Sequence, residues 1–319
     1  MPTARQIFEA RQRVQGIVRE TPLLHSPALS ARVPGEVFLK LESVQETGSF
    51  KLRGATARMA ALSEEERRRG VITVSTGNHG RAVAFAARRM GIPAVVCLTD
   101  RVPAVKRDAI AALGAEIRIA GATQDEAEAA ALRIAEAEGL TLIHPFDDPW
   151  VIAGQGTIGL ELLDRLPELD TVVVPLSGGG LAGGIALALE SADPALRVIG
   201  VSMERGAAMY ESIRAGGPVE VEEYETLADC LSGGIGPENR YTLDLCRRLL
   251  DAVHLVSEEE IAEAMRLLFR EERLVAEGGA AVGVAALLSG KVSPAATDRT
   301  VVVVSGRNID PDRLLSVVG

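Results

Sequence analysis

Short runs of β-branched and other apolar residues alternate with helical patterns along almost the whole chain. The runs lie at 36–41, 71–75, 94–98, 116–119, 141–144, 171–175, 197–201, 253–256 and 300–305. The valines at 172–174 and 301–304 make two of these runs continuously apolar, which is typical of parallel strands buried on both faces. Between the runs, segments such as 104–113 and 125–137 place apolar residues three and four positions apart. The alternation predicts an α/β fold with a mostly parallel sheet covered by helices.

Composition narrows the classes of function. The net charge of −10 and the 3% of aromatic residues do not suit a nucleic-acid surface, which needs basic clusters and stacking rings. No apolar run is long enough to cross a bilayer, and residues 1–20 lack the features of a signal peptide, so we expect a cytoplasmic protein with no membrane partner. Cys97, Cys230 and Cys246 stand far apart, which predicts buried free thiols rather than disulfides or a zinc site.

The strand-helix units form two groups on either side of the His144-Pro145 turn. Two lobes with a ligand site between them are common in open α/β folds. We expect a large cofactor-binding domain made of residues 1–70 and 146–319, with a small domain at 71–145 inserted in it.

One lysine stands out by its surroundings. Lys51 follows a glycine-hydroxyl-aromatic turn at 48–50 and opens a helical pattern. A desolvated lysine in such a place can act as nucleophile or base, whereas a solvated one is only an exposed side chain on the first turn of a helix. The segment alone leaves both interpretations open.

A glycine turn at 177–184 joins the strand at 171–175 to the start of a helix. Glycines allow close approach of the backbone, and the free N–H groups of a helix N-terminus attract anions. The spacing of a nucleotide P-loop and the acidic residue of a dinucleotide site are both lacking, so a monophosphate fits better than NAD or ATP. A tight turn with glycines for packing alone is the alternative.

Two more segments lie at strand ends. Residues 74–81 carry the hydroxyls of Ser75 and Thr76, then Gly77, Asn78 and His79, at the opening of a helix. These donors suit a carboxylate, although the hydroxyls could simply cap the helix and the histidine could be an ordinary buried one. Ser305 follows the last strand, at the edge where ligands of open α/β sheets bind.

A lysine, a monophosphate cradle, a carboxylate nest and a strand-end hydroxyl together indicate pyridoxal phosphate as cofactor and an amino acid as substrate. The segments at 49–55, 75–80, 153–157 and 177–181 resemble, in this order, the motifs of the serine/threonine dehydratase and serine racemase family. The resemblance covers nearly the whole chain. It favours this family over cysteine synthases, whose lysine motif typically continues Lys-Asp-Arg. It implies two open, twisted, mostly parallel sheets flanked by helices, the tryptophan-synthase-β-like fold (fold type II).

The resemblance also implies roles for single residues. Lys51 would be the Schiff-base lysine and the catalytic base, with Phe50 packed on the cofactor ring. Asn78 would bond the 3′-oxygen, and Ser305 would meet the pyridine nitrogen. The phosphate would be held by Gly178, Gly179, Gly180 and Leu181, and the substrate by Ser75, Thr76, Gly77 and His79. The implied reaction removes water and ammonia from a β-hydroxy amino acid of the L-threonine or L-serine type, giving a 2-oxo acid.

The chain departs from the family pattern in several places. Threonine at 76 replaces the serine of the racemases, which leaves racemisation as an alternative activity. Arg81 and Arg307 stand where glutamine and glycine are usual, and strings at 75–81 and 201–209 are similar to the hydroxyectoine-utilisation dehydratases. A larger hydroxy amino acid is therefore a second alternative, and a non-catalytic binding protein a third. Glu204 without a second carboxylate at Tyr210 predicts no metal site. The resemblance implies a homodimer.

Overall fold

The computed structural model describes residues 1–75, 77–100, 102, 104–121 and 124–319. The strands are β1 (Leu23–His25), β2 (Glu36–Leu41), β3 (Val71–Val74), β4 (Ala94–Leu98), β5 (Glu116–Ile119), β6 (Thr141–Leu142), β7 (Thr171–Pro175), β8 (Arg197–Met203), β9 (Ala252–Val256) and β10 (Arg299–Val304). The first helices are α1 (Ala4–Arg13), α2 (Pro27–Ser30), α3 (Lys51–Ala60), α4 (Glu64–Arg69), α5 (Asn78–Met90), α6 (Ala104–Ala111) and α7 (Gln124–Glu138). They are followed by α8 (Pro149–Arg165), α9 (Gly180–Glu190), α10 (Ala208–Ala215), α11 (Thr242–Leu249), α12 (Glu258–Arg270), α13 (Gly278–Leu288) and α14 (Pro311–Val318). Two short 3₁₀ helices are η1 (Glu42–Val44) and η2 (Asp229–Leu231).

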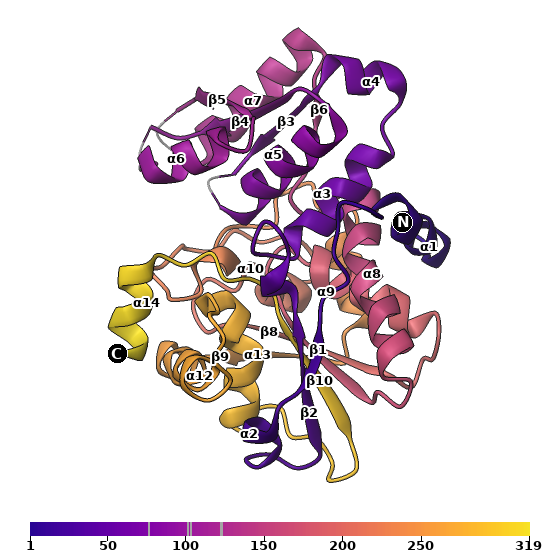
Figure 1. Ribbon diagram of the computed structural model, residues 1–319, viewed down its shortest axis with the longest axis vertical. Helices are drawn as coiled ribbons and strands as arrows, with labels where there is room; N and C mark the ends of the chain where they lie inside the picture. Colours follow the sequence, from indigo (N-terminus) through magenta and orange to yellow (C-terminus); the bar gives the residue numbers. More distant parts are fainter. Residues whose placement is uncertain (76, 101, 103, 122–123) are drawn as a thin grey trace.

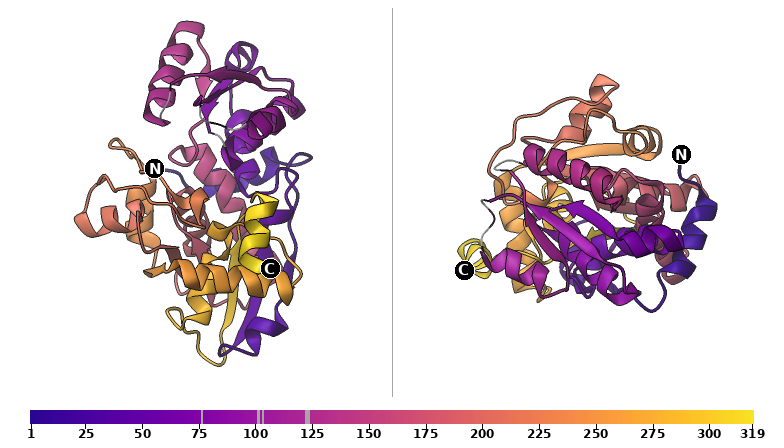
Figure 2. Two further views of the ribbon diagram at one scale, coloured as in Figure 1. Left: turned by 90° about the vertical axis from the view of Figure 1, so that its left-hand side faces the viewer. Right: turned by 90° about the horizontal axis from the view of Figure 1, so that it is seen from above.

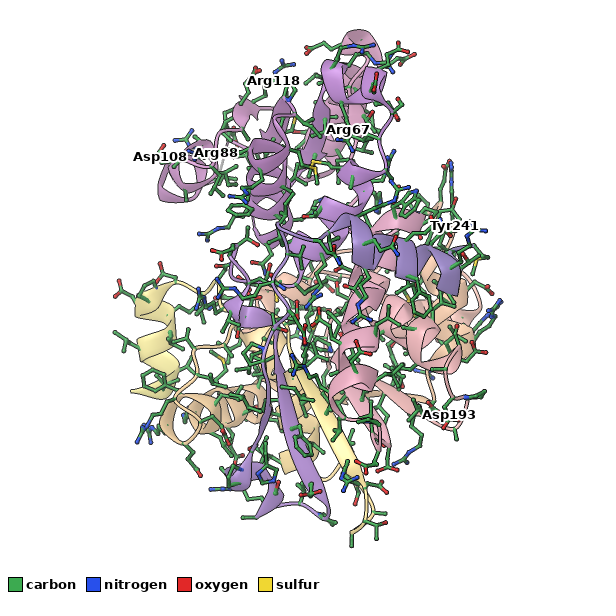
Figure 3. The ribbon with its side chains drawn as sticks, turned by 45° about the vertical axis from the view of Figure 1, so that its right-hand side comes forward. Arg67, Arg88, Asp108, Arg118, Asp193 and Tyr241 are labelled. Carbon is green, nitrogen blue, oxygen red and sulfur yellow. The ribbon has the colours of Figure 1, made fainter. Side chains whose placement is uncertain are left out.

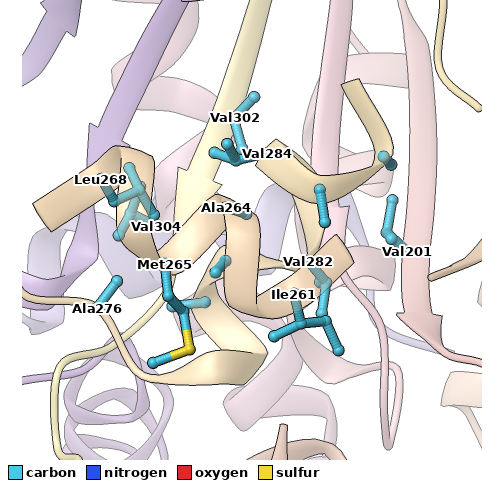
Figure 4. Close-up of a cluster of buried hydrophobic side chains, with 14 of the residues drawn as sticks. Val201, Ile261, Ala264, Met265, Leu268, Ala276, Val282, Val284, Val302 and Val304 are labelled. Carbon is cyan, nitrogen blue, oxygen red and sulfur yellow. The ribbon is translucent and has the colours of Figure 1, made fainter. Parts of the chain in front are cut away.

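The larger sheet has six strands in the order β1-β2-β10-β7-β8-β9. All neighbours pair in parallel except β1, which runs antiparallel to β2 at the edge. The central strand β10 is buried on both faces: Val302 and Val304 pack in a cluster with α12 and α13, whereas Val301 and Val303 pack in another with α8 and α9. Figure 4 shows the first of these clusters. The continuous valine run therefore reflects a strand covered by helices on both sides.

The smaller sheet has four parallel strands in the order β5-β4-β3-β6. Successive residues of its strands also pack in two different apolar clusters, one on each face of the sheet. Val96 packs with residues of α3 and α5, whereas Val95 and Cys97 pack against α7. Leu52 and Met59 of α3 belong to the first cluster, so the helix that starts at Lys51 helps to cover the small sheet.

The two sheets lie in two parts of the molecule. Figure 1 and the left view of Figure 2 show the part with β3–β6 above the part with the six-stranded sheet, and Figure 1 shows α3 in between. Charged side chains such as Arg88 and Asp108 project from the outer surface of the upper part (Figure 3). The strands β3–β6 all fall within 71–145, and the division into a large and a small domain at these bounds stays a prediction. Helix α3, which lies outside 71–145, packs on the small sheet and so connects the two parts of the molecule.

The fold class is as predicted, and each of the nine apolar runs overlaps a strand. The prediction missed β1, which has only three residues and no buried side chain. It also made β6 too long, because only Thr141 and Leu142 pair with β3 before the chain turns at His144. No helix in the described part of the chain is long and apolar enough to span a membrane.

Candidate active site

Lys51 lies at the start of α3, where the chain leaves the large sheet for the small one. Its Nζ donates a hydrogen bond to the carbonyl oxygen of Pro145 at 2.8 Å and lies 5.2 Å from the centre of the Phe50 ring. The backbone N–H of Phe50 donates to the carbonyl oxygen of Ser305 at 3.0 Å. The lysine predicted from one segment and the serine predicted from another are thus brought to the same end of β10.

Burial lowers the pKa of Lys51 to about 8, because the charged ammonium loses hydration there. The Cys230 thiol and the Glu277 carboxyl group act in the opposite direction and keep the pKa from falling further. A lysine with this pKa is partly neutral near physiological pH, and only the neutral amine is a nucleophile or a base.

Asn78 links the two parts of the molecule at this site. From the first turn of α5, its Nδ2 donates to Glu277 Oε1 at 2.8 Å, and its Oδ1 accepts from Asn308 Nδ2 at 2.6 Å. The same Asn308 amide also donates to the carbonyl oxygen of Thr47 at 2.8 Å. The side chain of Asn78 is therefore oriented by Glu277 and Asn308 of the large part, and Thr47 in turn orients Asn308.

Two of the helices that start at the site, α5 and α9, have a glycine in place of a capping side chain. Gly179 is the N-cap of α9 and Gly77 that of α5, and neither can accept a bond from the first-turn amides. By contrast, Ser257 caps α12 and Asp148 caps α8 through their side chains. Uncapped first-turn N–H groups, with the partial positive charge of the helix end, bind anions. The site thus offers two anion positions, which fits a phosphate and a carboxylate.

The glycine turn is shaped by Phe146. A Cβ built on Gly178 would lie 2.3 Å from Phe146 Cδ1, and one on Gly180 would lie 2.9 Å from the Phe146 carbonyl oxygen. Gly179 has a positive φ of 83°, which disfavours any other residue. Leu181 points into the core with α9. The glycines therefore serve packing and leave the helix end open, and the binding of a phosphate by this loop stays a prediction.

Ser305 is 3% exposed and directly follows β10, which pairs in parallel with β7. Parallel neighbours end at the same edge of a sheet, so Ser305 and the glycine turn after β7 lie at one edge. No residue that the structure describes forms a hydrogen bond with the Ser305 hydroxyl. The hydroxyl is available to a ligand there.

His79 is buried, and its Nε2 lies 2.9 Å from the carbonyl oxygen of Ile143. A carbonyl oxygen only accepts, so Nε2 carries the proton and Nδ1 is a free acceptor without a partner in the described chain. Burial lowers the pKa of His79 to about 3, with a further contribution from Lys51, so the ring stays neutral. The Ser75 hydroxyl accepts from the backbone N–H of Gly77 at 3.3 Å. Thr76 lies outside the described residues.

A buried ionic network holds α3 in place. The Arg53 guanidinium, two residues after Lys51, donates to Glu42 on one side (2.8 Å) and Glu161 of α8 on the other (2.6 Å). Lys40 of β2 also donates to Glu161, at 2.5 Å. All four side chains are buried. The network joins β2, η1, α3 and α8, and so fixes the helix that carries Lys51.

Several of these residues were not predicted from the sequence. Glu277, Asn308 and the network around Arg53 were missed, and Cys230 was wrongly expected to be buried, since its side chain is exposed. A lone acidic residue directly before the almost wholly apolar α13 was the available signal for Glu277. Of the two unusual arginines, Arg307 is exposed, whereas Arg81 keeps a buried Nε without a partner in the described chain. Glu204 accepts a hydrogen bond from Lys291 Nζ at 3.4 Å.

Comparison with known proteins agrees with this geometry. The family model for pyridoxal-phosphate dependent enzymes matches residues 14–306. The chain belongs to that family. It is 51% identical to a putative threonine dehydratase of Sinorhizobium fredii (strain NBRC 101917 / NGR234), over 95% of this chain and 91% of that protein. It is 43% identical to the L-threonine ammonia-lyase of Thermotoga maritima, over 100% of this chain and 78% of that protein. The structure of maize serine racemase superposes with a TM-score of 0.93 at 35% identity, covering 99% of this chain and 96% of that one.

These likenesses place the enzyme in the serine/threonine dehydratase and serine racemase branch, with the fold predicted from the sequence. Pyridoxal phosphate is its cofactor. The residues present fit the group: Lys51 supplies an amine of lowered pKa, and α9 supplies an uncapped helix end for the phosphate.

Proposed function

We propose that L-threonine and L-serine are the substrates of this pyridoxal-phosphate-dependent dehydratase, and that Lys51 is its catalytic lysine. The products would be ammonia with 2-oxobutyrate or pyruvate. The observation that carries the proposal is the half-buried Lys51 amine, held at the carbonyl oxygen of Pro145 beside the Phe50 ring, with its pKa lowered to about 8.

Pyridoxal phosphate, when bound, supplies an electron sink that acidifies the Cα proton of an amino acid. Lys51 would first hold the cofactor through its amine and, once displaced by the substrate amine, take up the Cα proton. General base action by a positioned group contributes about 10²–10⁴-fold to the rate. The bond from Nζ to the Pro145 carbonyl keeps the amine at the edge where both parts of the molecule meet.

The two uncapped helices would orient the ligands. The N-terminus of α9, with Gly178, Gly179, Gly180 and Leu181, would hold the cofactor phosphate. The N-terminus of α5, with Ser75, Thr76, Gly77 and His79, would hold the substrate carboxylate. Asn78 would direct its amide to the 3′-oxygen, since Glu277 and Asn308 already fix its side chain.

Ser305 supports elimination rather than transamination. A neutral hydroxyl at the pyridine nitrogen does not hold a proton there as a carboxylate would, so charge from Cα is less strongly withdrawn into the ring. Loss of the β-hydroxyl group is then favoured over the proton transfer that leads to transamination.

The experiment measures ammonia and 2-oxo acid release from the cofactor-loaded enzyme with L-threonine, L-serine, threo-3-hydroxyaspartate and hydroxylated diaminobutyrate in parallel. The Lys51→Ala variant, with its fold checked by circular dichroism, is the control and should be inactive. Turnover of L-threonine or L-serine supports the proposal. Turnover that persists in Lys51→Ala would overturn the role of the lysine, and formation of D-serine without ammonia would identify a racemase instead.

A larger hydroxy amino acid is the second candidate substrate. Arg81 lies on the same face of α5 as Asn78, and its buried Nε has no partner in the described chain. A polar group on a longer substrate side chain would satisfy it. Turnover of hydroxylated diaminobutyrate with no reaction of L-threonine or L-serine would support this candidate.

The location and the assembly complete the proposal. The enzyme would act in the cytoplasm as a homodimer, without nucleic-acid or membrane partners. Light scattering after size-exclusion chromatography gives the mass directly, and a monomer of 33.6 kDa would contradict the dimer.

A further inference from the structure

Cys230 differs from the other two cysteines in its surroundings. Cys97 and Cys246 are buried in apolar clusters, whereas the Cys230 side chain on η2 is exposed. Burial nevertheless raises the pKa of the Cys230 thiol well above its ordinary value, and the carboxylate of Glu277 raises it further. The residue therefore reaches solvent, whereas protein atoms around the sulfur keep the thiol poorly hydrated.

Neighbouring groups show where the Cys230 thiol lies. A Cys230 thiolate would raise the pKa of Lys51, and the Lys51 ammonium lowers the pKa of Cys230, so the two groups lie close enough to interact electrostatically. Glu277, which lies beside the thiol, also receives the amide of Asn78. Cys230 therefore faces the same space as Lys51 and Asn78.

Two glycines make room for this arrangement. A Cβ on Gly279, in the first turn of α13, would lie 2.3 Å from Cys230 Sγ. A Cβ on Gly306, directly after Ser305, would lie 1.9 Å from Glu277 Oε1. Any larger residue at 279 or 306 would displace the thiol or the carboxyl group, so the backbone on both sides of the site is shaped around this pair.

We propose that Cys230 is a cofactor-contacting residue, whose thiol forms the wall of the cleft against which bound pyridoxal phosphate packs. Sulfur is polarisable and makes favourable contacts with aromatic rings. Burial and the Glu277 carboxylate raise the pKa of the Cys230 thiol, so it stays protonated and does not compete with the Lys51 amine for the cofactor aldehyde. The inference rests on the proposed function only in taking Lys51 as the cofactor lysine.

The test is protection of one thiol by the cofactor. The protein is treated with iodoacetamide at mildly alkaline pH before and after loading with pyridoxal phosphate, and alkylation of each cysteine is followed by mass spectrometry. At about ten times Kd only about a tenth of the sites stay open, so alkylation of Cys230 should slow about tenfold. The buried Cys97 and Cys246 serve as internal controls and should react slowly in both samples.

A second arm reverses the order. Alkylation of the unloaded protein should prevent cofactor binding, measured by visible absorbance, because the added group fills the cleft. The loss of binding should follow the fraction of Cys230 that mass spectrometry finds alkylated, which excludes damage elsewhere. Equal alkylation of Cys230 in loaded and unloaded protein would overturn the inference and leave the role of Lys51 intact. Failure of the untreated protein to develop the absorbance would overturn both.

Discussion

The chemistry depends on the amine of Lys51, and the protonation of this amine determines the pH range in which it can react. With a pKa of about 8, about a quarter of the molecules carry a neutral amine at about pH 7.5, against about one in a thousand for an ordinary lysine. Covalent capture of pyridoxal phosphate needs the neutral form. Its initial rate, followed by visible absorbance, should rise with pH and level off above about pH 8. A rate that still climbs steeply at about pH 10 would show that Lys51 is an ordinary solvated lysine.

Glu277 carries a second prediction, on stability. Burial raises the pKa of Glu277 to about 7 in the folded protein from an ordinary 4.5, partly offset by the Asn78 amide. A raised pKa stabilises the fold at low pH, and this contribution is lost as pH rises through about 7. The Glu277→Gln variant cannot titrate at this position. Its stability relative to the natural protein should therefore increase by about 2–3 kcal/mol between about pH 5 and pH 8.

Urea unfolding of both cofactor-free proteins across this pH range measures the difference. Glutamine keeps an oxygen for the Asn78 amide, so the hydrogen bond is retained and only the charge is removed. A difference between the two proteins that does not change with pH would contradict the raised pKa.

Site residues could be predicted from the sequence where they stand within a local motif. Lys51, Asn78 and Ser305 were predicted from three separate segments, and the structure brings them to one edge. Cys230 stands in no local pattern that indicates a site, and the one signal for Glu277 was its place before an apolar helix, because both residues reach the site through the folding of η2 and α13. Their contribution depends on contacts between distant segments, which a sequence pattern does not encode.

At the scale of elements, α3 depends on the ionic network around Arg53. Removing one member of a buried network leaves its partners charged and unpaired, which costs about 3–5 kcal/mol. Arg53→Ala should lower stability by this amount, because Glu42 and Glu161 lose their counter-ion. The matched control is Arg5→Ala, whose exposed pair with Glu9 should contribute about 0.5 kcal/mol or less. Equal urea midpoints for the two variants would refute a structural role of the network.

The start of α9 gives the next prediction. Gly178→Ala places a methyl group against the Phe146 ring and should displace the turn, raising the Kd of pyridoxal phosphate about ten- to a hundredfold by the usual cost of overpacking. Gly217→Ala is the control, because no atom lies within 4 Å of the added Cβ. A fluorescence titration compares the two, and unchanged affinity in Gly178→Ala would remove this turn from the cofactor site.

Helices and strands could be predicted from the spacing of apolar residues where the elements are long or deeply buried. The four valines of β10 marked a central strand, and the period of α7 marked a surface helix. The three residues of β1 could not be found, because an edge strand without a buried side chain has no apolar pattern. The pattern also could not show that glycine N-caps leave α5 and α9 open, since this depends on the backbone beside them.

At the scale of the whole molecule, the site lies where two sheets meet. The small part contributes α5 with Asn78 and His79, and the large part contributes α9, Ser305 and Glu277. The alternation of strands and helices predicted such an arrangement, and the turn at His144 and Pro145 marked the return of the chain to the large part. The exact partners of Asn78 across this boundary required the structure.

The measurement that tests the central claim most directly is the position of the cofactor bond. The chain has four lysines, Lys40, Lys51, Lys106 and Lys291, so a label is assigned without ambiguity. Borohydride reduction of the loaded enzyme makes the bond to the cofactor permanent, and peptide mapping by mass spectrometry then locates it. We predict a pyridoxyl group on Lys51. A group on another lysine, or none in an enzyme that binds the cofactor, would contradict the account.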